Sequence, residues 1–188
     1  MFPLYRSLST GAIGTGYFYN PATDTWRTTT TVNAPQARRG GRAIYNGSTK
    51  IVIWGGEIWD PNATDPMGGQ GTYVLQNTGS VYDTVANTWT TMITTNAPTA
   101  RNYFTGYALG NEVFIFGGYG SGTTESYTGG IYNPIKNVWY SLNYTGTAPP
   151  TPNSQFSAWN GVSGMIGSGY AVWGTMDNSF GKDGYTYK

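Results

Sequence analysis

The chain has 188 residues and a net charge of +1, with 16% aromatic residues, only 10% charged residues and 28 glycines. It has no histidine and no cysteine, which excludes disulfides, thiol nucleophiles, Ser-His catalytic pairs and the usual zinc and copper sites. The absence of a basic run argues against nucleic-acid binding, and no apolar segment approaches the ~20 residues that a membrane helix needs.

The composition favours an all-β fold. Aromatic residues, threonine and valine favour strands, whereas glycine, asparagine and proline favour tight turns. No window shows a sustained apolar stripe at helical spacing. The length is close to that of one domain, so we treat residues 1–188 as a single unit or a piece of one. The first residues, MFPLYRSLSTGAIG, lack the basic start and the apolar core of a signal peptide.

A phrase from tyrosine to tryptophan occurs three times along the chain. It reads TGYFYNPATDTW at Thr15–Trp26, TGSVYDTVANTW at Thr78–Trp89 and TGGIYNPIKNVW at Thr128–Trp139, with seven residues from the last tyrosine to the tryptophan. Such recurrence marks a repeated supersecondary unit. Asn-Pro presets a tight turn between two strands. We expect the three tryptophans to be buried between neighbouring units, where each aromatic ring hides about 150–250 Å².

Two further motifs follow each of the first two tryptophans. Ala34–Arg38 reads APQAR and Ala97–Arg101 reads APTAR, and each arginine lies 12 residues after a tryptophan. The apolar runs KIVIWGG (Lys50–Gly56) and EVFIFGG (Glu112–Gly118) come next, each closed by a glycine pair. Such a pair lets the backbone leave a strand at an unusual φ.

These motifs resemble kelch repeats, in particular kelch-like repeats of secreted bacterial proteins. The resemblance implies four-stranded antiparallel blades of a β-propeller, with strands after AR, at IVIW or FIF, at SVYD or GIYN, and at the tryptophan. It divides the chain into a partial blade at 15–26, blades at 35–89 and 98–139, and a degenerate partial blade at 149–188. In the last unit Thr175 replaces a glycine of the pair, and Pro152 stands near the expected arginine. It also implies an extracellular or secreted location.

About three blades are fewer than the typical 4–8 of a closed propeller, and an open arc leaves two apolar faces in water. The first and last units both contain a third strand, so they do not combine as three strands plus one. We therefore expect a partial propeller or half-ring. It is either a fragment of a longer propeller or a homo-oligomer in which two copies close a ring of about six blades. Otherwise, residues 1–14 supply further strands.

Alternate connections of an antiparallel meander lie on the same face, here the face with the loops that follow the arginines and the glycine pairs. The loop from Glu57 to Gly79 has 23 residues, and loops beyond ~12–15 residues are usually functional or disordered. The candidate ligand-binding residues on this face are Arg38, Arg39, Glu57, Trp59, Asp60, Arg101, Tyr119 and Glu125. Two structural alternatives stay open: the arginines bond loop carbonyls, or the long loop only decorates a scaffold.

The expected function is a non-enzymatic binding or scaffolding module for carbohydrate or protein, because acidic, aromatic and arginine side chains suit a sugar or a polar peptide. One alternative is a structural subunit whose open blade faces form interfaces. Another is an enzyme similar to the kelch relatives that act on sialic acid, with Glu57 or Glu125 and Arg38 or Arg101 in acid–base roles.

The sequence favours neither a catalytic nor a metal centre. No two carboxylates form a pair at a defined spacing. The stretch from Asp60 to Asp65 offers carboxylates and carbonyls that could bind Ca²⁺, but it lacks the spacing of an EF-hand loop. We therefore predict no catalytic residue, no metal and no cofactor.

Overall fold

The structure is a computed structural model that describes residues 14–65, 67, 70–121, 128–142, 162–166, 169–173 and 184–187. These residues form antiparallel strands and turns and contain no α-helix, which confirms the all-β prediction. Glu125 and Pro152 lie outside the described residues, as do residues 1–13. None of the described segments forms a helix long and apolar enough to cross a membrane.

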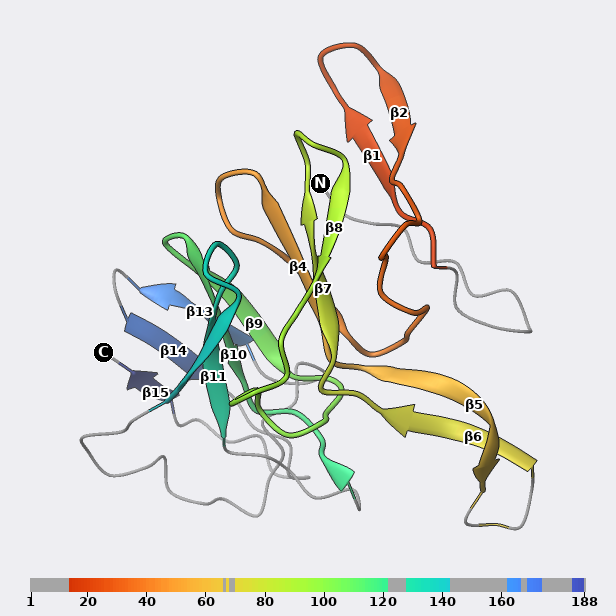
Figure 1. Cartoon of the computed structure of the whole chain (residues 1–188). Helices are drawn as coiled ribbons and strands as arrows, with labels where there is room; N and C mark the ends of the chain where they lie inside the picture. Colours follow the sequence, from red (N-terminus) through yellow and green to blue (C-terminus); the bar gives the residue numbers. More distant parts are fainter. Residues whose placement is uncertain are drawn as a thin grey trace.

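Two four-stranded antiparallel sheets form the centre of the molecule (Figure 1). Blade A contains, in the order of pairing, β3 (Arg42–Tyr45), β4 (Lys50–Trp54), β7 (Gly79–Asp83) and β8 (Thr88–Thr91). Blade B contains, in the same order, β9 (Thr105–Leu109), β10 (Glu112–Phe116), β11 (Gly129–Asn133) and β12 (Val138–Ser141). The strands lie where the motifs predicted them, so the kelch-type meander is confirmed.

Smaller sheets flank these blades. The hairpin of β1 (Tyr17–Asn20) and β2 (Thr25–Thr28) precedes blade A, and the sheet of β13 (Val162–Ile166), β14 (Gly169–Trp173) and β15 (Gly184–Tyr187) follows blade B. Strand β9 contacts both β3 and β13, so blade B lies between blade A and the C-terminal sheet. Figure 1 shows these sheets as successive units of an open arrangement.

The prediction of a long loop after the first glycine pair was wrong. Most of this segment forms an antiparallel hairpin of β5 (Glu57–Thr64) and β6 (Gln70–Leu75), which projects from blade A (Figure 1). The segments EIWD and TYVL are rich in residues that favour strands. The register shifts between Asp60 and Thr64, and Pro61 stands within this irregular stretch, where proline is tolerated because it donates no ladder hydrogen bond.

The repeated tyrosine-to-tryptophan phrase builds one polar network in each copy. The hydroxyls of Tyr82 and Tyr132 each donate to the side-chain oxygen of an asparagine five residues later, at 2.6 Å. In the first copy Tyr19 donates to Asp24 at 2.8 Å. The three acceptor residues have φ values of 51–55°, a left-handed conformation that Asn and Asp tolerate. Burial raises the pKa of Tyr132 well above its usual value, so its hydroxyl remains a donor.

Two of the three repeated tryptophans are buried as predicted. Trp89 is buried and donates from its indole nitrogen to the Thr30 carbonyl at 2.7 Å, and Trp139 is buried and donates to the Ile93 carbonyl at 3.0 Å. Trp26 was predicted to be buried as well, but it is 57% exposed. The cause is its place in the first unit, because no described element precedes the hairpin to cover that side.

The hydrophobic core lies between blades A and B. Trp54 is fully buried and makes edge contacts with Trp139 at 5.4 Å and with Phe104 at 5.1 Å between ring centroids. The two blades approach so closely that a Cβ added at Gly106 would lie 2.3 Å from Cδ1 of Ile44. The buried residues of this cluster are Ile44, Val52, Trp54, Val81, Met92, Phe104, Val113, Ile115, Tyr132 and Trp139.

Candidate functional site

The glycine pairs bring the predicted loops together on one face. Gly56 and Gly118 have φ values of +81° and +89°, and a Cβ on either would lie 2.5 Å from a backbone oxygen, that of Arg39 or Asn102. The segment after each pair consequently lies against the segment after each AR motif. Arg39 and Glu57 exchange backbone hydrogen bonds of 3.0 and 2.8 Å. We call the surface formed by these segments and the hairpin β5–β6 the loop face.

Arg38 and Arg101 are buried clamps beneath the loop face. The Nη1 of Arg38 donates to the carbonyls of Gly55 and Thr78, and the Nη1 of Arg101 donates to those of Gly117 and Thr128 at 3.0 and 2.6 Å. The exposed fractions of these residues are only 5% and 0%. Both arginines therefore tie the first glycine of each pair to the threonine just before the third strand, as the structural alternative for the AR motif supposed.

Arg39 and Glu57 form the charged centre of the loop face. Arg39 Nε lies 2.5 Å from Glu57 Oε1, and the side chains are 53% and 12% exposed. The Arg39 guanidinium also lies over the ring of Tyr73, 3.2 Å from its centroid. Ion pairing and cation–π contact together hold Arg39 between the blade and the hairpin.

Asn102 connects this centre to blade B. Its Nδ2 donates to Glu57 Oε2 at 3.1 Å, and its backbone exchanges hydrogen bonds of 3.0 and 2.9 Å with Tyr119. Its Oδ1 is buried and accepts no hydrogen bond from the described residues. An unsatisfied buried acceptor of this kind destabilises a fold by about 1–3 kcal/mol. The site residues Glu57 and Tyr119, which are far apart in sequence, therefore meet through one asparagine that the sequence did not single out.

Trp59 lies on the projecting hairpin. Its ring makes an edge contact with Tyr73 at 5.2 Å and covers Gly71, where an added Cβ would lie 2.4 Å from the indole. It is nevertheless 47% exposed, and Val74 and Met67 of the same hairpin region are 37% and 97% exposed. The hairpin therefore presents to solvent one aromatic ring that is held in place and the aliphatic side chains of two neighbouring residues.

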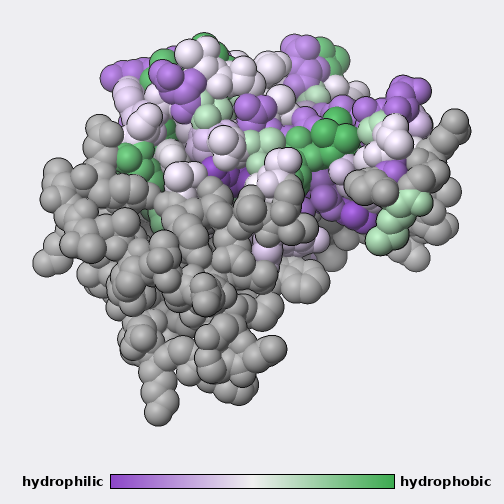
Figure 2. All heavy atoms as spheres, turned by 90° about the horizontal axis from the view of Figure 1, so that it is seen from below, coloured by the Kyte–Doolittle hydropathy of each residue, from purple (hydrophilic) through white to green (hydrophobic). Residues whose placement is uncertain are grey.

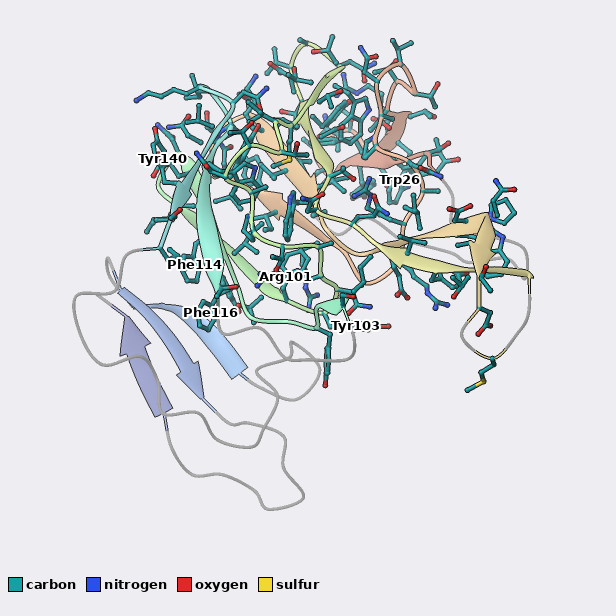
Figure 3. The ribbon with its side chains drawn as sticks, turned by 60° about the horizontal axis from the view of Figure 1, so that its bottom comes forward. Trp26, Arg101, Tyr103, Phe114, Phe116 and Tyr140 are labelled. Atoms are coloured by element: carbon teal, nitrogen blue, oxygen red, sulfur yellow. The ribbon has the colours of Figure 1, made fainter. Side chains whose placement is uncertain are left out.

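Tyr103 and Tyr119 extend the loop face over blade B. Their rings meet edge to face at 6.3 Å, and the Tyr103 amide donates to the Gly40 carbonyl at 2.9 Å. Tyr103 has a φ of +51°, which is unusual for a bulky residue. Its side chain points outward from the ribbon (Figure 3), whereas Arg101 lies within it.

The loop face is mixed in polarity. Figure 2 views the molecule from this side, and among the coloured residues, which are those that the structure describes, hydrophobic side chains appear interspersed with hydrophilic ones. The described residues contain no group of three or more His, Cys, Asp or Glu that could hold a metal ion. Asp60 accepts a hydrogen bond from the Asn62 amide at 2.9 Å and Asp65 accepts one from the Met67 amide at 2.8 Å, so both carboxylates cap local turns.

Sequence reasoning found most of the loop face and missed three of its members. Arg39, Glu57, Trp59 and Tyr119 lie on this face, and their ligand-binding role stays a prediction; Glu125 lies outside the described residues. The missed residues are Tyr73, Asn102 and Tyr103. The signal for Asn102 was present, because it follows the second AR motif as Arg39 follows the first.

The repeat pattern agrees with comparisons to known proteins. A family model, the KLHDC2/KLHL20/DRC7 Kelch-repeats domain, matches residues 9–188, so the chain belongs to the Kelch-repeat family. Kelch repeats generally mediate protein–protein interaction or scaffolding, and such domains are generally non-enzymatic binding modules.

A more distant likeness is to the dynein alpha chain of the flagellar outer arm from Chlamydomonas reinhardtii. The two sequences are 26% identical over an alignment of 152 residues, and the match covers 70% of this chain but only 3% of the dynein chain. The chain therefore corresponds to a small part of that protein.

Proposed function

We propose that the chain is a non-enzymatic scaffolding module that binds a polypeptide partner through its loop face. The observation that carries this proposal is the hairpin β5–β6. It projects from the blades (Figure 1) and exposes Trp59, Val74 and Met67, while Arg39, Glu57 and Tyr73 fix its base. A rigidly held aromatic residue beside aliphatic groups suits a protein interface, where buried aromatics carry much of the affinity.

The backbone of the hairpin favours a polypeptide over a sugar. Among the described residues, β5 and β6 form a two-stranded sheet, and beyond the bridge of Glu57 to Arg39 they pair only with each other. Edge strands of this kind offer N–H and C=O groups in a row, and an extended peptide can add a strand to them. A sugar could stack on Trp59 but would not use this row of backbone groups.

The relatives support a scaffolding role. The likeness to a segment of a dynein alpha chain is consistent with a repeat module inside a larger assembly. The extracellular or secreted location expected from the bacterial resemblance stays a prediction, as do a glycan ligand and an acid–base activity of Glu57.

The proposal is tested by selecting binding peptides from a random phage-displayed library against the full chain and measuring their affinity for two variants. Trp59→Ala should weaken binding by at least about tenfold, in line with an aromatic hot spot. The control is Ile135→Ser, which changes a 69% exposed side chain in the turn between β11 and β12. This turn lies at the opposite ends of the strands from the glycine pairs, and its change should leave affinity unaltered.

Two results would contradict the proposal. One is peptide binding that Trp59→Ala leaves intact. The other is a failure to select any peptide while the same chain binds defined sugars on a glycan array. Retained folding of Trp59→Ala is checked by its thermal unfolding, because loss of the hairpin would also lower affinity.

A further inference from the structure

The two sides of blade A are covered very differently. On the side toward blade B, Ile44, Val52 and Trp54 are buried in the common core. The residues that alternate with them in β3 and β4 point to the other side, toward the hairpin β1–β2. Together with the outer-strand aromatics they line a cavity of about 470 Å³, and these residues are Ala43, Tyr45, Ile51, Ile53, Tyr82 and Trp89.

Blade B shows what covers this side in a complete junction. The strand registers of the two blades correspond, since Tyr82 pairs with Trp89 as Tyr132 pairs with Trp139. The positions of blade B that match the cavity lining are Gly106, Ala108, Val113, Ile115, Tyr132 and Trp139. Blade A covers them with its two inner strands, β3 and β4, and with Val81 of its third strand.

The hairpin β1–β2 provides only the outer half of such a cover. Tyr19 pairs with Trp26 in the register of Tyr82 and Trp89, so β1 and β2 correspond to the third and fourth strands of a blade. Phe18 takes the position of Val81 and lines the cavity. Among the described residues β1 pairs only with β2, and the cavity therefore marks the place of a first and a second strand.

The C-terminal sheet has the complementary composition. Trp173 pairs with Gly184 in β14 and β15 as Trp54 pairs with Gly79 in blade A. Strands β13, β14 and β15 therefore correspond to the first, second and third strands of a blade. Strand β15 reads GYTY, and the equivalent stretch from Gly16 to Tyr19 reads GYFY. Both ends of the described chain thus present nearly the same third strand.

We propose that two copies of this chain close a six-bladed ring by strand exchange. In the shared blade, β13 and β14 come from the first copy and β1 and β2 come from the second copy. Strand β1 of the second copy pairs with β14 of the first and takes the place of that chain's own β15. Each copy then contributes blades A and B and takes part in two shared blades, and six blades lie within the range of closed propellers. The symmetry is twofold, as in most dimers.

The sizes of the facing residues fit this arrangement. In the junction of blades A and B, Ile44 packs closely on Gly106. By register, Gly164 and Ala171 of the second copy take the positions of Ile44 and Val52. In the cavity lining Ala43 and Tyr45 stand where blade B has the smaller Gly106 and Ala108. In this junction the larger residues are therefore those of blade A and the smaller ones those of the second copy. The summed residue volume stays similar, and volume-conserving exchanges keep a core well packed.

The exchange balances in backbone pairing. Strand β15 pairs with β14 over Gly184–Tyr187, and the matching stretch of β1 offers the same number of positions in the same register. The pairing of β1 with β2 is already present in the separate chain. What the dimer adds is the removal of the cavity lining from water. Apolar burial therefore favours the exchanged form over two separate chains.

The register defines two disulfides that distinguish the exchanged form from the separate chain, which has no natural cysteine. Val172 pairs with Tyr185 within one chain, and in the exchanged blade it pairs with Tyr17 of the other copy. Val172→Cys combined with Tyr17→Cys should give a covalent two-chain species on a non-reducing gel. Val172→Cys combined with Tyr185→Cys is the matched control, because its disulfide holds β15 in place and blocks the exchange.

Light scattering behind a sizing column then reads out the assembly. The wild-type chain should have about twice its 20.3 kDa mass, and the oxidised Val172→Cys/Tyr185→Cys variant should have the mass of one chain until reductant restores the dimer. The proposal is overturned if the oxidised control keeps the mass of two chains, or if the wild type is a single chain over a roughly hundredfold range of concentration. An intrachain disulfide in Val172→Cys/Tyr17→Cys would also overturn it.

Discussion

The junction between blades A and B and the junction between the hairpin β1–β2 and blade A share one polar network but differ in their cores. In both, a tryptophan indole donates to a carbonyl of the preceding unit. An asparagine side-chain oxygen also accepts from a backbone amide of that preceding unit: Asn137 accepts from Ile93, and Asn87 accepts from Thr30. Among the strands that the structure describes, only the first junction has inner strands on both sides. The repeated phrase therefore fixes the outer strands, whereas the core depends on the inner two.

The largest expected effect comes from the filled junction. Trp54→Ala removes a fully buried ring between Trp139 and Phe104 and should lower the free energy of unfolding by about 3–5 kcal/mol. Trp26→Ala is made in the Val172→Cys/Tyr185→Cys variant, whose oxidised form is a separate chain. At this 57% exposed position it should lower the free energy of unfolding by less than about 1 kcal/mol. Urea unfolding followed by fluorescence measures both. Equal losses would show that Trp26 is packed as tightly on the outer side of its hairpin as Trp54 is between blades A and B.

The buried clamp arginine ranks next. Arg101→Met removes the guanidinium donor of the Gly117 and Thr128 carbonyls, of which Thr128 keeps the Gly117 amide. It should destabilise the fold by about 3 kcal/mol, since a buried arginine and several of its hydrogen bonds are lost. Arg39→Met removes a side chain that is 53% exposed and should cost about 0–1 kcal/mol. A similar loss for both variants would mean that Arg39 is as much a part of the scaffold as Arg101.

The polar network of the repeated phrase should contribute less to the free energy of unfolding than the buried tryptophan or the buried arginine. Asn137→Ala loses the bonds to Tyr132, Ile93 and Thr91 and places alanine at a φ of 53°, for an expected loss of about 2 kcal/mol. Asn137→Gly keeps the backbone conformation and isolates the hydrogen bonds. In the first unit Asp24→Ala should cost about 1 kcal/mol or less because its bond to Tyr19 is exposed. Chemical denaturation ranks the three variants, and a larger loss at Asp24 would reverse the comparison.

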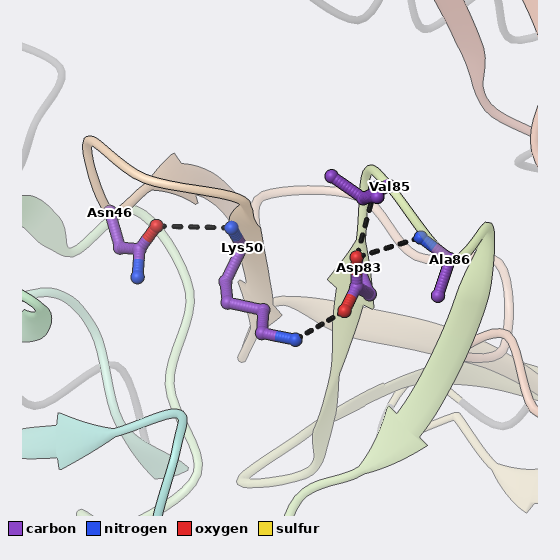
Figure 4. A network of polar contacts seen from close by, with 5 residues as sticks. All are labelled: Asn46, Lys50, Asp83, Val85 and Ala86. Carbon is purple, nitrogen blue, oxygen red and sulfur yellow. Dashed lines mark hydrogen bonds and ion pairs between the residues drawn. The ribbon is translucent and has the colours of Figure 1, made fainter.

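The smallest expected effect is a loss of stability at acid pH that comes from an ion pair of blade A. Lys50 and the amides of Ala86 and Val85 bond Asp83 (Figure 4) and lower its pKa from 3.8 to about 2. The ion pair is therefore fully stabilising above pH ~4 and is lost as pH falls toward 2, with a contribution of about 1 kcal/mol for partly exposed side chains. Blade B has Glu112 and Asn133 at these positions.

The control for this pH dependence is Asp83→Asn. It keeps an oxygen for the turn amides, as Asn133 does in blade B, and removes the titrating group. Thermal unfolding between pH 2 and pH 5 should show a shallower acid loss for the variant than for the wild type. Parallel curves would assign the acid sensitivity to other carboxylates.

The repeats made the blades predictable from sequence, and the unrepeated segment was the part that failed. Trp89 and Trp139, and the clamp role left open for Arg38 and Arg101, follow from motifs at fixed spacing. The hairpin β5–β6 lies between motifs and has no second copy for comparison, and its register shift near Pro61 hides the alternation of a strand. The contact of Asn102 with Glu57 depends on how adjacent blades approach, which no local pattern contains.

Hydrogen exchange at β1 tests the central claim, that the cavity beside blade A is completed by a second copy. The wild-type chain and the oxidised Val172→Cys/Tyr185→Cys variant are compared by mass spectrometry. We predict at least tenfold slower exchange in the wild type for Tyr17–Asn20, because the second edge of β1 is then paired, and equal exchange for Val113–Ile115 in the filled junction. Equal exchange at Tyr17–Asn20 in both proteins would contradict the account.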